Sequence, residues 1–147
     1  MKSIDELLSG KNRVDELREK FFSALLRRPA ARKQAEEILE KYGAGELTEK
    51  LMREAEESGL VDDEAFARLF VEGHLQWGNL KIAHELRMRG VDSREIAEAL
   101  DEAEDETERA QELAEGWRKA GIEDKKIQSR LLSRGFTNRA VRFAVNG

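Results

Sequence analysis

Apolar residues recur at spacings of three and four along most of the chain, the pattern of helices that each bury one face. The clearest stretch, residues 60–100, has these apolar positions: Phe66, Leu69, Phe70, Leu80, Ile82, Leu86, Ile96, Ala99 and Leu100. Breaks fall around Gly78 and Gly90. Gly90 can adopt the left-handed conformation that ends a helix, and Asn79 and Asp92 are suited to capping the helices that follow. This stretch is therefore predicted to form three short helices.

The same pattern occurs three times along the chain. Each copy has an apolar residue, a leucine and a glycine spaced by four, in Ala35-Leu39-Gly43, Ile82-Leu86-Gly90 and Ile127-Leu131-Gly135. The glycine is followed by Ala44, Val91 or Phe136, and then by an apolar pair: Leu47/Leu51, Ile96/Leu100 or Val141/Val145. A fixed period of this length is typical of helical repeat arrays. We therefore predict an all-α fold, an elongated, curved tandem array of three three-helix repeats that resemble helix-turn-helix units.

The predicted organisation is an N-terminal tail at residues 1–12 and three-helix repeats at 13–59, 60–104 and 105–147. In repeat 1, Pro29 is expected in the first turn of the second helix, where its missing N–H has no helical partner. No linker is long or rich in Pro, Gly or Ser, so the repeats should be tightly joined. The acidic stretch between repeats 2 and 3 is the expected place of bending.

Composition agrees with a helical protein and excludes several kinds of site. Of the 147 residues, 39% are charged and 39% hydrophobic, and there is a single proline. The absence of cysteine excludes a disulfide framework and a thiolate metal site. No apolar run is long enough for a signal peptide or a membrane span. A monomeric, cytoplasmic protein without membrane attachment is expected.

The charge is unevenly distributed around a net value of −5. Residues 117–147 contain eight Lys or Arg and two acids, whereas residues 92–115 contain eleven acids and two arginines. The acidic stretch is most simply a solvated helix, although it could also mimic a phosphate backbone or meet a basic partner. The basic stretch either attracts phosphates or an acidic protein face, or is itself only a solvated face.

Motifs of catalysis are missing from the sequence. His74 and His84 are the only histidines, and His84-Glu85 is followed by no second histidine at the spacing of a zinc protease. There is no phosphate-binding loop and no nucleophile motif. We therefore predict no catalytic, metal or cofactor-binding residue, no cofactor and no enzymatic activity. Four aromatic residues are expected in the core or between repeats: Trp77, Trp117, Phe136 and Phe143.

Several segments resemble the RecX regulators. The central repeat of that family is similar to residues 60–67, Gly78, residues 81–91 (KIAHELRMRGV) and residues 96–100. Residues 129–136 (SRLLSRGF) resemble the last RecX repeat, and residues 37–63 resemble the close of the first. The resemblance implies a regulator that binds the RecA recombinase filament in its groove on single-stranded DNA. It also implies that this binding blocks filament extension and restrains recombination, ATP hydrolysis and coprotease activity.

One segment departs from the family pattern. After Phe66-Ala67, where the family is basic, this chain has Glu72, Gly73, His74, Gln76 and Trp77, so this part of repeat 2 is not expected to touch DNA. Contact with a partner or polyanion is instead assigned to eight cations: Lys81, Arg87, Arg89, Lys126, Arg130, Arg134, Arg139 and Arg142. Two alternatives stay open, a helix-turn-helix DNA-binding protein and a helical adaptor for another protein.

Overall fold

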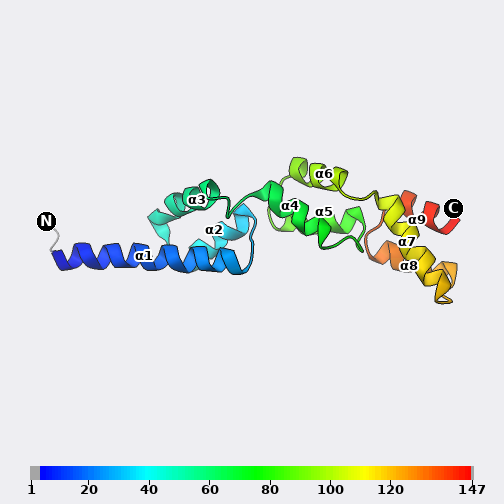
Figure 1. Cartoon of the computed structure of the whole chain (residues 1–147), viewed down its shortest axis with the longest axis horizontal. Helices are drawn as coiled ribbons and strands as arrows, with labels where there is room; N and C mark the ends of the chain where they lie inside the picture. The colour runs from blue at the N-terminus through cyan, green and yellow to red at the C-terminus, as the bar shows by residue number, and fades with distance from the viewer. Residues whose placement is uncertain (1–3, 147) are drawn as a thin grey trace. The chain divides into compact units, whose positions relative to one another are not determined.

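The computed structural model describes residues 4–146, which form nine α-helices and one short 3-10 helix and contain no strand (Figure 1). The predicted all-α fold is thereby confirmed. The helices, in chain order, are α1 (Ile4–Arg27), α2 (Arg32–Lys41), η1 (Gly45–Leu47), α3 (Thr48–Glu57), α4 (Asp63–Glu72), α5 (Asn79–Met88), α6 (Ser93–Glu102), α7 (Glu106–Lys119), α8 (Asp124–Ser133) and α9 (Asn138–Asn146).

The chain divides into two compact units, and the division falls inside α4, between Phe66 and Ala67. The first unit contains α1, α2, η1 and α3, and the second contains α5 to α9. The repeat boundaries given above stay a prediction.

A glycine with positive φ ends the second helix of each predicted repeat. The φ angles are 70° at Gly43, 87° at Gly90 and 85° at Gly135. In each turn the N–H of the residue after the glycine donates to the carbonyl of the leucine four residues before the glycine, which closes the helix end. The three bonds are Ala44 to Leu39 at 3.0 Å, Val91 to Leu86 at 3.1 Å and Phe136 to Leu131 at 3.1 Å. The three residues that follow the glycines are all buried.

The core of the first unit joins three helices. Phe21 and Leu25 of α1, Leu39 of α2 and Leu51 of α3 are each no more than 2% exposed. This burial of large apolar side chains is the main favourable contribution to the stability of the unit.

The first unit differs from the sequence-based expectation at two helix starts. Residues 4–12, expected as a tail, are the first turns of α1, because a single glycine at position 10 costs only about 1 kcal/mol in a helix. Residues 1–3 of that predicted tail lie outside the described part. The second helix begins at Arg32 rather than Pro29, because Asp63 Oδ1 accepts a hydrogen bond from the Arg32 N–H at 2.7 Å and fixes the start there.

Within the second unit, α7, α8 and α9 share a core. Phe136 is 1% exposed at its centre, as expected, and Ile127 and Leu131 are fully buried. Phe143, in contrast, is 55% exposed. It lies two residues after the buried Val141, and at about 100° per residue this places it on the opposite side of α9.

Leu69 and Leu80 were also expected to face inward, and both are exposed. Leu69 lies midway between the buried Ala67 and Val71, and Leu80 lies two residues before the buried Ile82. A shift of two positions rotates a helical side chain by about 200°, so neither leucine can share the buried face.

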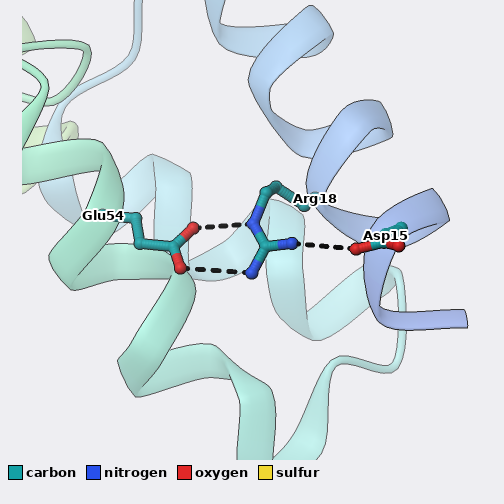
Figure 2. Close-up of polar contacts among 3 residues, drawn as sticks. All are labelled: Asp15, Arg18 and Glu54. Carbon is teal, nitrogen blue, oxygen red and sulfur yellow. Dashed lines mark hydrogen bonds and ion pairs between the residues drawn. The ribbon is translucent and has the colours of Figure 1, made fainter. Parts of the chain in front are cut away.

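An ion pair links α1 to α3 in the first unit (Figure 2). Arg18 Nε and Nη2 donate to the two carboxylate oxygens of Glu54 at 2.8 and 3.2 Å, and Nη1 donates to Asp15 at 3.1 Å. The hydrogen bond from Arg18 lowers the pKa of Glu54 below its ordinary value of 4.5, although desolvation opposes the shift. The same hydrogen bond raises the pKa of Arg18.

We expect Glu54→Gln to lower the free energy of unfolding near neutral pH by about 0.5 to 1 kcal/mol, because the pair is partly exposed. A carboxyl with a lowered folded pKa stabilises above pH 4.5 and loses this effect as the pH falls through the folded pKa. The difference between wild type and variant should therefore shrink in acid, as measured by urea unfolding at several pH values. Glu49→Gln, at a carboxylate whose side chain is 89% exposed, is the control and should change little. A difference that stays constant into acid would contradict the assignment.

Candidate functional site

All eight cations assigned to partner contact lie in the second unit. Four of them are exposed and form no ion pair within residues 4–146: Arg87, Lys126, Arg139 and Arg142. The other four lie over aromatic rings: Lys81, Arg89, Arg130 and Arg134. The predicted set thus divides into four exposed cations without an ion pair in the described residues and four cations that already contact an aromatic ring of the protein.

The cation–aromatic contacts recur at one position of the repeat. The residue immediately before the turn glycine is Tyr42, Arg89 or Arg134, and each contacts a side chain from the first helix of its own repeat. Arg89 lies 4.8 Å from the ring centre of Phe70, and Arg134 lies 5.1 Å from that of Trp117. In the first repeat the residue before the glycine supplies the ring and the first helix supplies the cation. Lys20 of α1 lies 4.4 Å from the ring centre of Tyr42. Cation–π attraction thus links the first two helices of every repeat.

Repeats 2 and 3 meet through their backbones. The Gly78 N–H donates to the Arg134 carbonyl at 2.8 Å, and the Leu80 N–H donates to the Gly135 carbonyl at 3.0 Å. A Cβ atom at Gly78 would lie 2.1 Å from the Phe136 nitrogen, and one at Gly135 would lie 2.4 Å from the Lys81 Cβ. Only glycine allows the two backbone segments to approach this closely at either position. The turn after α8 is therefore docked onto the start of α5.

Two buried charged residues of α7 reinforce this junction. Glu106, 8% exposed, accepts hydrogen bonds from the Asn79 N–H at 2.7 Å, the Thr137 hydroxyl at 2.7 Å and the Thr137 N–H at 3.3 Å. It thereby holds the start of α5 against the segment that begins α9. The start of α9 is completed by the Thr137 hydroxyl, which accepts a hydrogen bond from the Ala140 N–H, as expected for a cap.

Arg109 is the second buried charge, at 3% exposure. Its guanidinium donates to the carbonyls of Leu75, Trp77 and Glu104 and to the side-chain oxygen of Asn79. Burial lowers the pKa of Arg109, and the nearby carboxylate of Glu106 opposes this shift. Within residues 4–146, every buried side-chain nitrogen or oxygen has a hydrogen-bond partner. The junction therefore carries its buried charges without an unsatisfied group.

Comparison with known proteins agrees with this arrangement. Residues 62–100 match the family model described as RecX, second three-helix domain. Residues 62–100 are thus similar to a three-helix domain of RecX. The resemblance stated from the sequence is thereby confirmed, and the matched residues extend from just before α4 to α6.

Solved structures of RecX proteins share the fold of the chain. The crystal structure of RecX from Lactobacillus salivarius matches with a TM-score of 0.79 and 19% sequence identity, over 92% of this chain and 96% of that chain. A crystal structure of regulatory protein RecX matches with a TM-score of 0.76 and 17% identity, over 100% of this chain and 80% of that chain. Among curated proteins no significant match was found.

The acidic stretch, which was the expected bending point, lies beside the junction of repeats 2 and 3. The acidic stretch between repeats 2 and 3 was predicted to bend, and it lies within the second unit, where Gly78, Gly135, Glu106 and Arg109 join the two repeats. Two of the charges counted as solvated, Glu106 and Arg109, are instead buried at the junction. The remaining carboxylates are crowded, and a hydrogen bond shared with Glu112 raises the pKa of Glu104.

Other site types find little support in the described residues. In residues 4–146 no group of three or more His, Asp or Glu side chains is placed to hold a metal ion. No helix there is long and apolar enough to cross a membrane. A shallow groove between α8 and α9 is lined by Gln128, Leu132, Asn138, Val141 and Arg142, so one of the predicted cations borders it.

We expect Gly78→Ala to lower the free energy of unfolding by about 3 kcal/mol or more, since its new methyl group would overlap the backbone of the neighbouring repeat. Gly116→Ala is the matched control, because Gly116 lies within α7 with no atom near its would-be Cβ. That variant should be more stable than wild type by up to about 1 kcal/mol. Chemical denaturation followed by circular dichroism measures both, and equal effects of the two variants would contradict the docked junction.

Arg109→Met should lower the free energy of unfolding by roughly 3 kcal/mol or more, because three carbonyls and the Asn79 side chain lose their donor inside the protein. Arg87→Met removes the same charge from an exposed position of α5 and should change stability by less than about 0.5 kcal/mol. The comparison uses thermal and urea unfolding of both variants. Similar stabilities would show that the Arg109 contacts contribute little.

Proposed function

We propose that this protein is a non-enzymatic regulator of the RecA recombinase. In this proposal it binds in the groove of the filament that RecA forms on single-stranded DNA, blocks filament extension, and inhibits recombination, ATP hydrolysis and coprotease activity. The observation that carries the proposal is the match of residues 62–100 to the second three-helix domain of RecX. The fold shared with RecX crystal structures over nearly the whole chain adds to it.

The free cations of the second unit support contact with a polyanionic assembly. Arg139 and Arg142 project from α9, are exposed, and pair with no carboxylate within the described range. Binding a partner costs such side chains little free energy, because no internal ion pair has to break first. They can meet phosphates or acidic side chains of a larger partner and raise the rate of association at low salt.

We expect substoichiometric amounts of the protein to lower the rate of ATP hydrolysis by RecA on single-stranded DNA. The double variant Arg139→Gln/Arg142→Gln should require an about 5- to 30-fold higher concentration for half-inhibition, corresponding to ~1 to 2 kcal/mol of binding energy. A coupled ATPase assay at low salt measures both proteins.

The control variant is Arg53→Gln/Arg94→Gln, which removes the same charge at two exposed arginines that already pair with Glu49 and Glu98. It should inhibit like wild type. If the wild-type protein leaves the ATPase rate unchanged at low salt, regulation of RecA is excluded. Tight binding to duplex DNA without RecA, falling steeply with salt, would favour a helix-turn-helix DNA-binding protein instead.

A further inference from the structure

An open groove lies between α1 and α2 in the first unit, and we call it the α1–α2 groove. It has a volume of about 530 Å³, and its apolar lining includes Ala24 of α1, Ala30 of the connecting segment and Ile38 of α2. The two alanines have short side chains, so they leave unfilled the space that longer side chains would occupy between packed helices. Ile38 is half-buried and packs against the core of the unit. The groove therefore has an apolar wall that is supported by the core.

Three cations line the same groove, namely Arg27, Arg28 and Lys41. All three are exposed, and none forms an ion pair within residues 4–146. Arg27 and Lys41 stand in the last turns of their helices, where the helix dipole favours a cation. Among the described residues that line the groove, Glu37 is the only carboxylate, so three positive charges against one negative charge leave a net charge of +2.

The dimensions of the α1–α2 groove fit a short segment of polypeptide. The α2 residues that line it extend from Gln34 to Lys41 and span about 10 Å of helix. This length corresponds to about two turns of a bound helix or about three residues of an extended chain. Pockets for small molecules cover most of the surface of their ligand, whereas this groove is open to solvent along one side.

The chemistry of the lining distinguishes a polypeptide from a nucleic acid. No aromatic ring lines the groove among the described residues, so an unpaired base would find no ring to stack on. Glu37 repels a phosphate, but it can accept a hydrogen bond from a peptide N–H. The Gln34 Oε1 already accepts a hydrogen bond from the Ala31 N–H at 3.1 Å, which leaves the amide hydrogens of Gln34 to donate to a partner carbonyl or carboxylate.

An acidic segment with an aliphatic side chain satisfies both parts of the lining. Its carboxylates can pair with Arg27, Arg28 and Lys41, and its aliphatic side chain can cover Ile38 and remove apolar surface from water. We propose that the α1–α2 groove is a docking site for an acidic polypeptide segment that carries an aliphatic side chain. The site lies in the first unit, where the function proposed above assigns no contact, and it does not depend on that function.

The test uses the full-length, isotope-labelled protein and a synthetic peptide of about 14 residues in which leucine recurs every three or four positions among glutamates. An NMR titration should shift the backbone amide signals of residues 24–41 more than those of the rest of the chain. Two peptides of the same length serve as comparisons, one with leucine among glutamines and one of glutamate alone. Both should shift these signals less, because each lacks one of the two features that the groove recognises.

Variants of the groove should weaken binding of the leucine–glutamate peptide, as measured by fluorescence anisotropy at low salt. Arg27→Gln/Lys41→Gln should raise the Kd about 5- to 30-fold. Ala24→Gln keeps the charge and fills the groove with a longer side chain, so it should also raise the Kd. The matched control Lys33→Gln/Lys50→Gln removes the same charge at two exposed lysines of the first unit outside the groove lining, and it should bind like wild type. Circular dichroism shows whether each variant remains folded.

Three outcomes would overturn the proposal. The first is absence of shifts in residues 24–41 when the leucine–glutamate peptide is added. The second is an equal rise of the Kd in both double variants, which would show attraction to the general charge of the unit. The third is oligothymidine binding that is as tight as peptide binding and is weakened by Arg27→Gln/Lys41→Gln, which would show that the groove recognises phosphates. Failure here leaves RecA regulation untouched, because the variants of the ATPase assay use Arg139 and Arg142 on α9 of the second unit.

Discussion

The fold depends on a glycine turn that occurs three times. At Gly43, Gly90 and Gly135 the chain takes a positive φ angle that other residues adopt at a cost, and the next N–H bonds back to a buried leucine. This bond satisfies a carbonyl at the end of the helix. It also directs the apolar residue that follows the glycine toward the core. The second and third helices of each repeat are set against each other by this local geometry.

The third of these turns also joins two repeats. Gly135 and Gly78 allow two backbones to approach until their N–H and carbonyl groups bond across the junction. Glu106 and Arg109 then satisfy the helix start and the carbonyls that this approach buries. Residues 67–147, which hold repeat 3 and most of repeat 2, consequently form one compact unit. The bonds across the junction place surface residues at the start of α5 beside the turn after α8.

The cation–aromatic contacts show how one position can serve structure and surface together. The residue before each turn glycine is placed against the first helix of its repeat, so a long side chain there meets a ring on that helix. In repeats 2 and 3 that residue is an arginine, and its polar end remains near solvent. The same contact that holds two helices together thus arranges positive charge over aromatic faces.

The sequence by itself determined the helical class, the repeat and its turns, because these follow from local spacing, glycine conformation and capping groups. The resemblance to RecX followed from the same residues. Local spacing could not tell that Leu69, Leu80 and Phe143 are exposed, since each lies in a helix that carries apolar residues on more than one side. Only the tertiary structure decided which charges are buried. Arg109 and Glu106 belong to a run of acids and bases that looks solvated, and their partners come from residues about 30 positions away. It also decided that Arg130 and Arg134 share one tryptophan and that Arg134 meets repeat 2, because these contacts depend on how helices pack and not on their order in the chain.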